Sequence, residues 1–92
     1  PWAVWGAGAK GVMFLNLLDL GPDAVPVVVD QNPRKQGGYL PGTGQAIVPP
    51  AALRDHGIRT VLVMNPNYRD EVAATLSREA LDADLVVLEG RR

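Results

Sequence analysis

Three glycines near the start of the chain have the spacing of a turn that binds phosphate groups. Gly6, Gly8 and Gly11 follow an apolar run at residues 2–5 and precede apolar residues at helical spacing, so they join a predicted strand to a predicted helix. In such a turn the first glycine permits the tight bend, the second lets backbone N–H groups approach a pyrophosphate, and the third lets the helix lie close to the sheet. The helix N-terminus adds partial positive charge that favours an anion.

An acidic residue, Asp30, ends the next apolar run about 20 residues after the glycine turn, where a dinucleotide-binding fold places the carboxylate that accepts hydrogen bonds from a ribose. This spacing favours a ligand of the adenosine type. A purely structural interpretation is also available, because small residues suit any strand-turn-helix and Asp30 can cap a turn through Asn32 and Pro33. Both interpretations stay open.

A long polar segment, residues 31–46, follows Asp30 and is predicted to be a loop. Loops longer than about 12 to 15 residues are uncommon in compact domains and are usually functional. This one leaves the carboxyl end of a predicted strand, which is the edge of a parallel sheet where ligands bind. It carries Arg34, Lys35, Tyr39 and Thr43, side chains that suit a phosphorylated, ring-bearing ligand.

Alternating strands and helices must position these residues. The pattern predicts strands at residues 2–5, 25–29, 47–48, 60–64 and 84–88, and helices from Gly11 to a stop at Gly21 and Pro22, at 50–56, and from an Asn67 N-cap through Arg78. Right-handed crossovers then place helices on both faces of a parallel sheet. We predict a single α/β domain over residues 1–92, a small doubly wound, Rossmann-like, three-layer fold with five strands in the order 3-2-1-4-5 and three helices.

Composition excludes several classes of function. A formal net charge of -1 argues against nucleic-acid binding, which needs a concentrated basic surface. The chain has no cysteine and one histidine, so we expect no metal site. Ser77 lies in the middle of a predicted helix and His56 in the turn that ends another, which leaves no nucleophilic triad. No apolar run reaches the roughly 20 residues of a membrane helix, so we expect a cytoplasmic protein. The start at Pro1, inside an apolar run, suggests an excised domain.

Three strings resemble a known family: WGAGAKGVMFLNLL, VVVDQNPRKQGGYLPGTGQAIVPPAAL and VLVMNPNYRDEV. Together they are similar to the C-terminal domain of S-adenosylmethionine-dependent sugar C-methyltransferases. The resemblance implies that a zinc domain and a methyltransferase domain, which holds S-adenosylmethionine, lie elsewhere in the parent chain, so that this domain itself carries no cofactor. It also implies that this domain helps to position a nucleotide-linked deoxysugar, typically a dTDP-sugar.

The resemblance can be carried to individual positions, with Pro66 as a departure from the family pattern. The residues expected to contact substrate or nucleotide are Gly6, Gly8, Lys10, Gly11, Asp30, Lys35, Tyr39, Gly42, Thr43, Gly44, Asn65, Asn67 and Tyr68.

The first predicted helix is apolar over most of its circumference. Between residues 12 and 20 only Asn16 and Asp19 are polar, whereas a surface helix needs an apolar stripe of little more than about 100° to cover a sheet. The excess predicts a contact with a neighbouring domain or with another subunit. A helix that simply leaves apolar side chains in contact with water is the alternative.

Three functional hypotheses follow. The first is a non-catalytic, substrate-positioning domain of a sugar-nucleotide C-methyltransferase, with the nucleotide sugar and the other domains of the parent chain as partners. The second is an NAD- or nucleotide-binding module that uses Gly6, Gly8, Gly11 and Asp30. The third is a structural domain, left from a duplication, whose glycine turn binds nothing.

Overall fold

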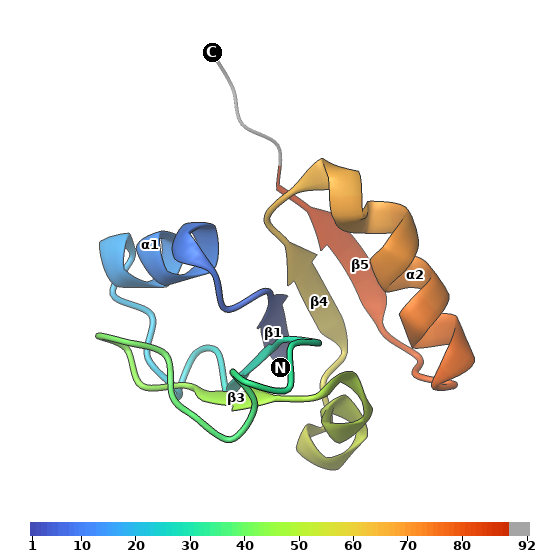
Figure 1. Cartoon of the computed structure of the whole chain (residues 1–92), viewed down its shortest axis with the longest axis horizontal. Coiled ribbons are helices and arrows are strands. Elements are labelled where there is room, and N and C mark those ends of the chain that lie inside the picture. Colours follow the sequence, from blue (N-terminus) through green and yellow to red (C-terminus); the bar gives the residue numbers. More distant parts are fainter. Residues whose placement is uncertain (89–92) are drawn as a thin grey trace.

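A computed structural model describes residues 1–88 as a five-stranded parallel sheet with helices on both faces (Figure 1). The strands lie in the order β3-β2-β1-β4-β5, and every neighbouring pair is parallel. The predicted fold class and strand order are therefore confirmed. The strands are β1 (Trp2–Trp5), β2 (Val27–Val29), β3 (Ala46–Val48), β4 (Thr60–Val63) and β5 (Asp84–Val87).

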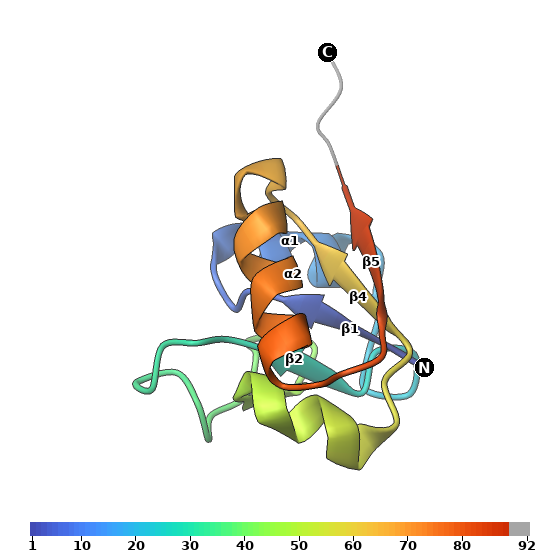
Figure 2. The same cartoon turned by 90° about the vertical axis from the view of Figure 1, so that its right-hand side faces the viewer.

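The register of the strands brings their carboxyl ends to one edge of the sheet. Trp5, the last residue of β1, is level with Val29 of β2 and with Val63 of β4. The residues that follow these strands therefore meet at the same height. Figure 2 shows β1, β4 and β5 fanned by the twist that parallel sheets normally have.

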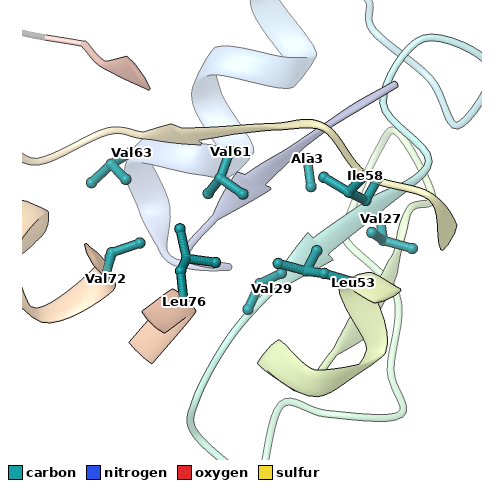
Figure 3. Close-up of a cluster of buried hydrophobic side chains, with 9 residues drawn as sticks. All are labelled: Ala3, Val27, Val29, Leu53, Ile58, Val61, Val63, Val72 and Leu76. Carbon is teal, nitrogen blue, oxygen red and sulfur yellow. The ribbon is translucent and has the colours of Figure 1, made fainter. Parts of the chain in front are cut away.

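Apolar residues cover both faces of the sheet, as expected for parallel strands buried on two sides. One face packs against η1 (Pro50–His56) and α2 (Arg69–Arg78), and the other packs against α1 (Ala9–Leu17). The first of these clusters is drawn in Figure 3 and consists of Ala3, Val27, Val29, Leu53, Ile58, Val61, Val63, Val72 and Leu76. Burial of each Val, Leu or Ile side chain in this cluster contributes about 1.5–3 kcal/mol.

The helical segments differ in detail from the prediction. The first helix ends at Leu17, four positions before the expected stop at Gly21, and the chain then turns through Asp19 with a positive φ of 54°. Residues 50–56 form a 3₁₀-helix. The third segment begins with a 3₁₀ turn, η2 (Pro66–Tyr68), that runs directly into α2.

Residues 31–46 are not the structureless loop that the sequence predicted. Backbone bonds fold residues 37–40 back, antiparallel, along β3: Gly37 donates to the carbonyl of Ile47 at 2.9 Å, and Leu40 donates to that of Gln45 at 2.8 Å. Leu40 is only 2% exposed and Gln45 is fully buried. The glycine-rich composition of this segment gave no indication that Leu40 and Gln45 are buried.

Within residues 1–88 the structure contains no helix that is both long enough and apolar enough to cross a membrane.

Candidate functional site

A cleft of about 410 Å³ lies at the carboxyl edge of the sheet, between the ends of β1, β2 and β4. Ligands of doubly wound folds bind at this edge, where the chain leaves neighbouring strands in opposite directions. The cleft is lined by Trp5, Gly6, Gly8, Ala9, Lys10, Gly11, Asp30, Gln31, Lys35, Met64, Asn65, Tyr68 and Glu71.

The glycine turn has the geometry that its three roles require. Gly6 adopts a φ of +112°, a conformation that L side chains rarely adopt, and its N–H donates to the carbonyl of Val29 at 2.6 Å. A Cβ on Gly11 would lie 2.5 Å from the Gly6 carbonyl oxygen, whereas a Cβ on Gly8 would meet nothing within 4 Å. Gly11 therefore serves packing, and Gly8 keeps the approach to the turn open.

The N-terminus of α1 opens onto the cleft. Gly8 is the N-cap, and no side chain caps the first turn of this helix within the described residues. Because the first N–H groups of a helix have no partner inside the helix, they are available to an anion beside Gly8, Ala9 and Lys10, all of which line the cleft.

Asp30 holds the glycine turn in place. One carboxylate oxygen accepts a hydrogen bond from the Ala7 N–H at 2.9 Å, and the other accepts one from the Asn32 N–H at 2.9 Å. This is the turn-capping role that the structural interpretation expected. Since each carboxylate oxygen has a second lone pair, a ribose contact by Asp30 stays a prediction.

Both lysines of the chain reach the cleft. Lys10 lies in the first turn of α1 and Lys35 in the segment after β2, where its Nζ lies 3.5 Å from the carbonyl oxygen of Ala7. Both side chains are exposed. Asp30 and Glu71 add two carboxylates to the lining, so the cleft carries both positive and negative charge.

The β4 side of the cleft is built from an aromatic and an amide side chain. Asn65 accepts a hydrogen bond from the Asn67 N–H at 3.0 Å and so caps the helical segment that begins with Pro66. The predicted N-cap, Asn67, is therefore wrong by two positions, because proline favours the first position of a helix and not its interior. Tyr68 follows in the same turn and is 53% exposed.

Five of the residues predicted as contacts do not line the cleft: Tyr39, Gly42, Thr43, Gly44 and Asn67. Tyr39 is 71% exposed and forms an antiparallel bridge with Ala46. The Thr43 hydroxyl donates to Gln45 Oε1 at 2.6 Å, and Gln45 in turn donates to the carbonyl of Leu20 at 2.7 Å.

Thr43 therefore helps to fix its own segment. Gly42 and Gly44 take positive φ values of 86°, which the tight turn between Tyr39 and Ala46 requires. A direct ligand contact by any of these residues stays a prediction.

Sequence reasoning missed part of the cleft, namely Trp5, Gln31, Met64, Glu71 and Ala9. Trp5 ends β1, Met64 directly follows β4 and Gln31 lies two residues after β2. These positions could have identified them once the strand order was known. Gln31 also links the cleft to α2, because its side-chain amide donates to Thr75 Oγ1 at 3.2 Å.

A glycine turn at the carboxyl edge of a sheet with this strand order defines a Rossmann-like domain. Accordingly, the structure is similar to the crystal structure of UDP-D-quinovosamine 4-dehydrogenase from Vibrio fischeri, with a TM-score of 0.69 and 21% sequence identity over 97% of this chain and 77% of that one. At this identity the likeness shows the fold alone.

Residues 2–87 match the family described as the C-methyltransferase C-terminal domain, and the chain belongs to that family. The family resemblance inferred from sequence is thus confirmed, and the chain is a domain of a larger methyltransferase. A search of curated protein sequences finds no match. Among the described residues no group of three or more His, Cys, Asp or Glu side chains is placed to hold a metal ion.

Proposed function

We propose that this chain is the substrate-positioning domain of an S-adenosylmethionine-dependent C-methyltransferase, and that its cleft binds the nucleotide part of a dTDP-type deoxysugar. The observation that carries the proposal is the cleft itself, which joins the glycine turn, an uncapped helix N-terminus and two lysines. Methyl transfer would be performed by another domain, which holds S-adenosylmethionine, with zinc in a further one.

The arrangement suits a diphosphate beside the glycine turn. Backbone N–H groups at the start of α1 supply hydrogen-bond donors, and the helix dipole favours negative charge there. Lys10 and Lys35 add two exposed ammonium groups to the lining of the cleft. Lysine binds phosphate as a point charge, so its contribution falls as salt screens the charge.

The opposite wall suits the rest of the ligand. Trp5 and Met64 are half-buried, and the ring of Tyr68 is half-exposed, so this side of the cleft offers apolar and aromatic surface. Asn65 and Glu71 provide polar groups next to it. A base or a sugar ring with hydroxyl groups matches such a mixed surface, since ligand pockets combine apolar lining with a few polar groups that orient the ligand.

The proposal is tested by titrating the chain with dTDP while recording backbone amide chemical shifts by NMR. We expect saturable shifts at residues 6–11 and around Asn65 and Tyr68. Lys10→Ala and Lys35→Ala should each weaken binding by about two- to fivefold, the size of an exposed charge contact. Arg34→Ala is the matched control, because Arg34 is also exposed and cationic but does not line the cleft.

Two outcomes would overturn the proposal in different directions. Saturable NAD binding without dTDP binding, lost in Asp30→Ala while the fold is retained, would favour the dinucleotide module suggested by the glycine and aspartate spacing. No binding of either nucleotide, together with an unchanged substrate KM when Lys10 and Lys35 are replaced in the whole methyltransferase, would favour a structural domain.

Micromolar affinity for S-adenosylmethionine would contradict the division of labour between the domains. Calorimetric titration of the cofactor into the chain measures it, and we expect no saturable heat.

A further inference from the structure

The outer edge of β5 carries backbone groups that have no partner in the described part of the chain. Asp84 donates its N–H to the carbonyl of Arg59, and Leu88 donates to that of Val63, both at 2.8 Å. In a parallel ladder the residues that bond to the neighbouring strand alternate with those that do not. The N–H and C=O groups of Leu85 and Val87 therefore point away from β4.

The β3 edge of the sheet is covered by another segment, whereas the β5 edge is open in the described part of the chain. At the β3 edge, residues 37–40 cover the strand with antiparallel bonds, among them one from Ile47 N–H to the carbonyl of Gly38 at 2.9 Å. Natural sheets protect an edge in this way, or with charges, prolines or bulges, because an open edge pairs with other strands. Residues 85–88 are Leu, Val, Val and Leu, so β5 has none of these protections beyond Asp84.

We propose that β5 pairs antiparallel with β5 of a second copy of this chain, about a twofold axis at Val86. Leu85 of one copy then faces Val87 of the other, and each such pair exchanges two hydrogen bonds through the outward-facing groups. The two Val86 residues form the non-hydrogen-bonded pair between them. The two sheets join into one continuous sheet across the interface.

Side chains around this axis fit a second copy. Val86 and Leu88 are 44% and 38% exposed, and pairing covers these apolar groups. Asp84 comes to lie opposite Leu88 of the other copy, so the twofold does not oppose like charges, which destabilise a strand pair.

The side of α2 that lies toward the open β5 edge also permits close approach of a second copy. Gln31, two residues after β2, donates to Thr75, so the Thr75 flank of this helix faces the centre of the sheet. With about 3.6 residues per turn, Ala73 and Ser77 lie on the opposite flank, toward β5. Both residues are small and exposed, and they leave room for the same helix of the second copy.

The covered β3 edge determines that the assembly closes. If both edges were open, β5 of one copy could pair with β3 of the next, and this head-to-tail contact would propagate into a filament. Because residues 37–40 occupy the β3 edge, the open edge offered by a second copy is again β5. The contact is therefore isologous and stops at a dimer.

Disulfide trapping tests the register. The chain has no cysteine, and residues in a non-hydrogen-bonded antiparallel pair have Cα atoms about 4.5 Å apart, within the range of a disulfide. We expect Val86→Cys to form a covalent dimer under mild oxidation. Ala51→Cys, at an exposed position of η1, is the matched control and should react much more slowly. Equal rates for the two variants would refute the twofold at Val86.

Sedimentation equilibrium tests the assembly itself. We expect the wild-type chain to reach a dimer and no higher species. Val86→Lys places two ammonium groups face to face at the axis and should raise the dimer dissociation constant by about tenfold or more, whereas Ala51→Lys adds the same charge at an exposed position of η1 and should leave it unchanged. A wild-type chain that stays monomeric at high concentration, or a dimer that Val86→Lys leaves intact, would overturn the proposal. Circular dichroism confirms that each variant folds, and if Val86→Lys does not fold, the trapping result decides.

Discussion

Replacing Gly11 by alanine should destabilise the domain although it adds a better helix former. Gly11 is a buried residue of α1, and a Cβ at this position would lie 2.5 Å from the carbonyl oxygen of Gly6 and 3.6 Å from Val4 Cγ1. The close neighbour is backbone, which cannot rotate away. The helix must therefore move off the sheet by roughly 1 Å, and such a gap removes a quarter to a half of each dispersion contact that it opens.

The magnitude follows from two opposing effects. Overpacking of this kind costs about 1–3 kcal/mol, whereas replacing a helical glycine by alanine normally stabilises by about 0.5–1 kcal/mol. We expect a net loss of about 1–2 kcal/mol in the free energy of unfolding. For a domain of this size each kcal/mol shifts the melting temperature by about 4–8 °C, so the Tm of Gly11→Ala should fall by about 5–15 °C.

Thermal and urea unfolding followed by circular dichroism measure this loss, with Gly21→Ala as the control. A Cβ on Gly21 would meet nothing within 4 Å, and Gly21 has no positive φ, so this variant should match or slightly exceed the wild type in stability. A Tm of Gly11→Ala equal to that of Gly21→Ala would show that the helix does not need to lie against the turn.

Three other substitutions probe the supports of the cleft, and their unfolding free energies are measured in the same way. Asp30→Ala should cost about 1.5–3 kcal/mol, because it removes a charged acceptor from two backbone N–H groups; a variant as stable as the wild type would show that the carboxylate does not hold the turn. Asn65→Ala removes the cap of the segment that leads into α2 and should cost about 1 kcal/mol, whereas Asn67→Ala, which leaves the cap in place, should cost much less. Thr43→Val removes the hydrogen bond to buried Gln45 and should cost about 1 kcal/mol, without weakening any dTDP binding; a loss of binding at unchanged stability would instead support Thr43 as a ligand contact.

Strand positions could be predicted from the apolar pattern, and strand order from the alternation of strands and helices with right-handed crossovers. Val27, Val28 and Val29 are buried on both faces of the sheet, and such β-branched runs are typical of central parallel strands. The predicted strand ends differ from the observed ones by one or two residues. For example, the sequence predicts that β2 begins at Val25, which is buried but precedes the strand. A buried residue next to a strand has the same apolar character as one within it.

The segment between β2 and β3 could not be predicted in the same way. Its fold depends on buried Leu40 and Gln45, on a hydrogen bond from Asn16 Nδ2 to the carbonyl of Pro41 at 3.1 Å, and on the backbone bonds to β3. These contacts join residues far apart in the sequence. Local composition shows only glycine, proline and polar residues, which favour turns without indicating where the turns pack.

The apolar surface of α1 was predicted correctly as far as its exposure is concerned. Met13, Leu17 and Leu18 are 60%, 77% and 56% exposed, while Leu15 is buried against the sheet. A helix that covers a sheet needs buried apolar residues such as Leu15, but it does not need exposed ones such as Leu17. What contacts the exposed side chains in the methyltransferase stays a prediction.

The two walls of the cleft differ in how far a motif can identify them. The glycine turn and Asp30 lie in one β-α-β unit, so their spacing along the chain reflects their distance in space. The other wall comes from β4, which is next to β1 only because the strand order reverses there. Since Trp5 is level with Val63, Met64 and Asn65 must emerge beside Gly6. A predicted strand order therefore carries site information that no local motif contains, and residues directly after β4 in related domains are the ones to examine first.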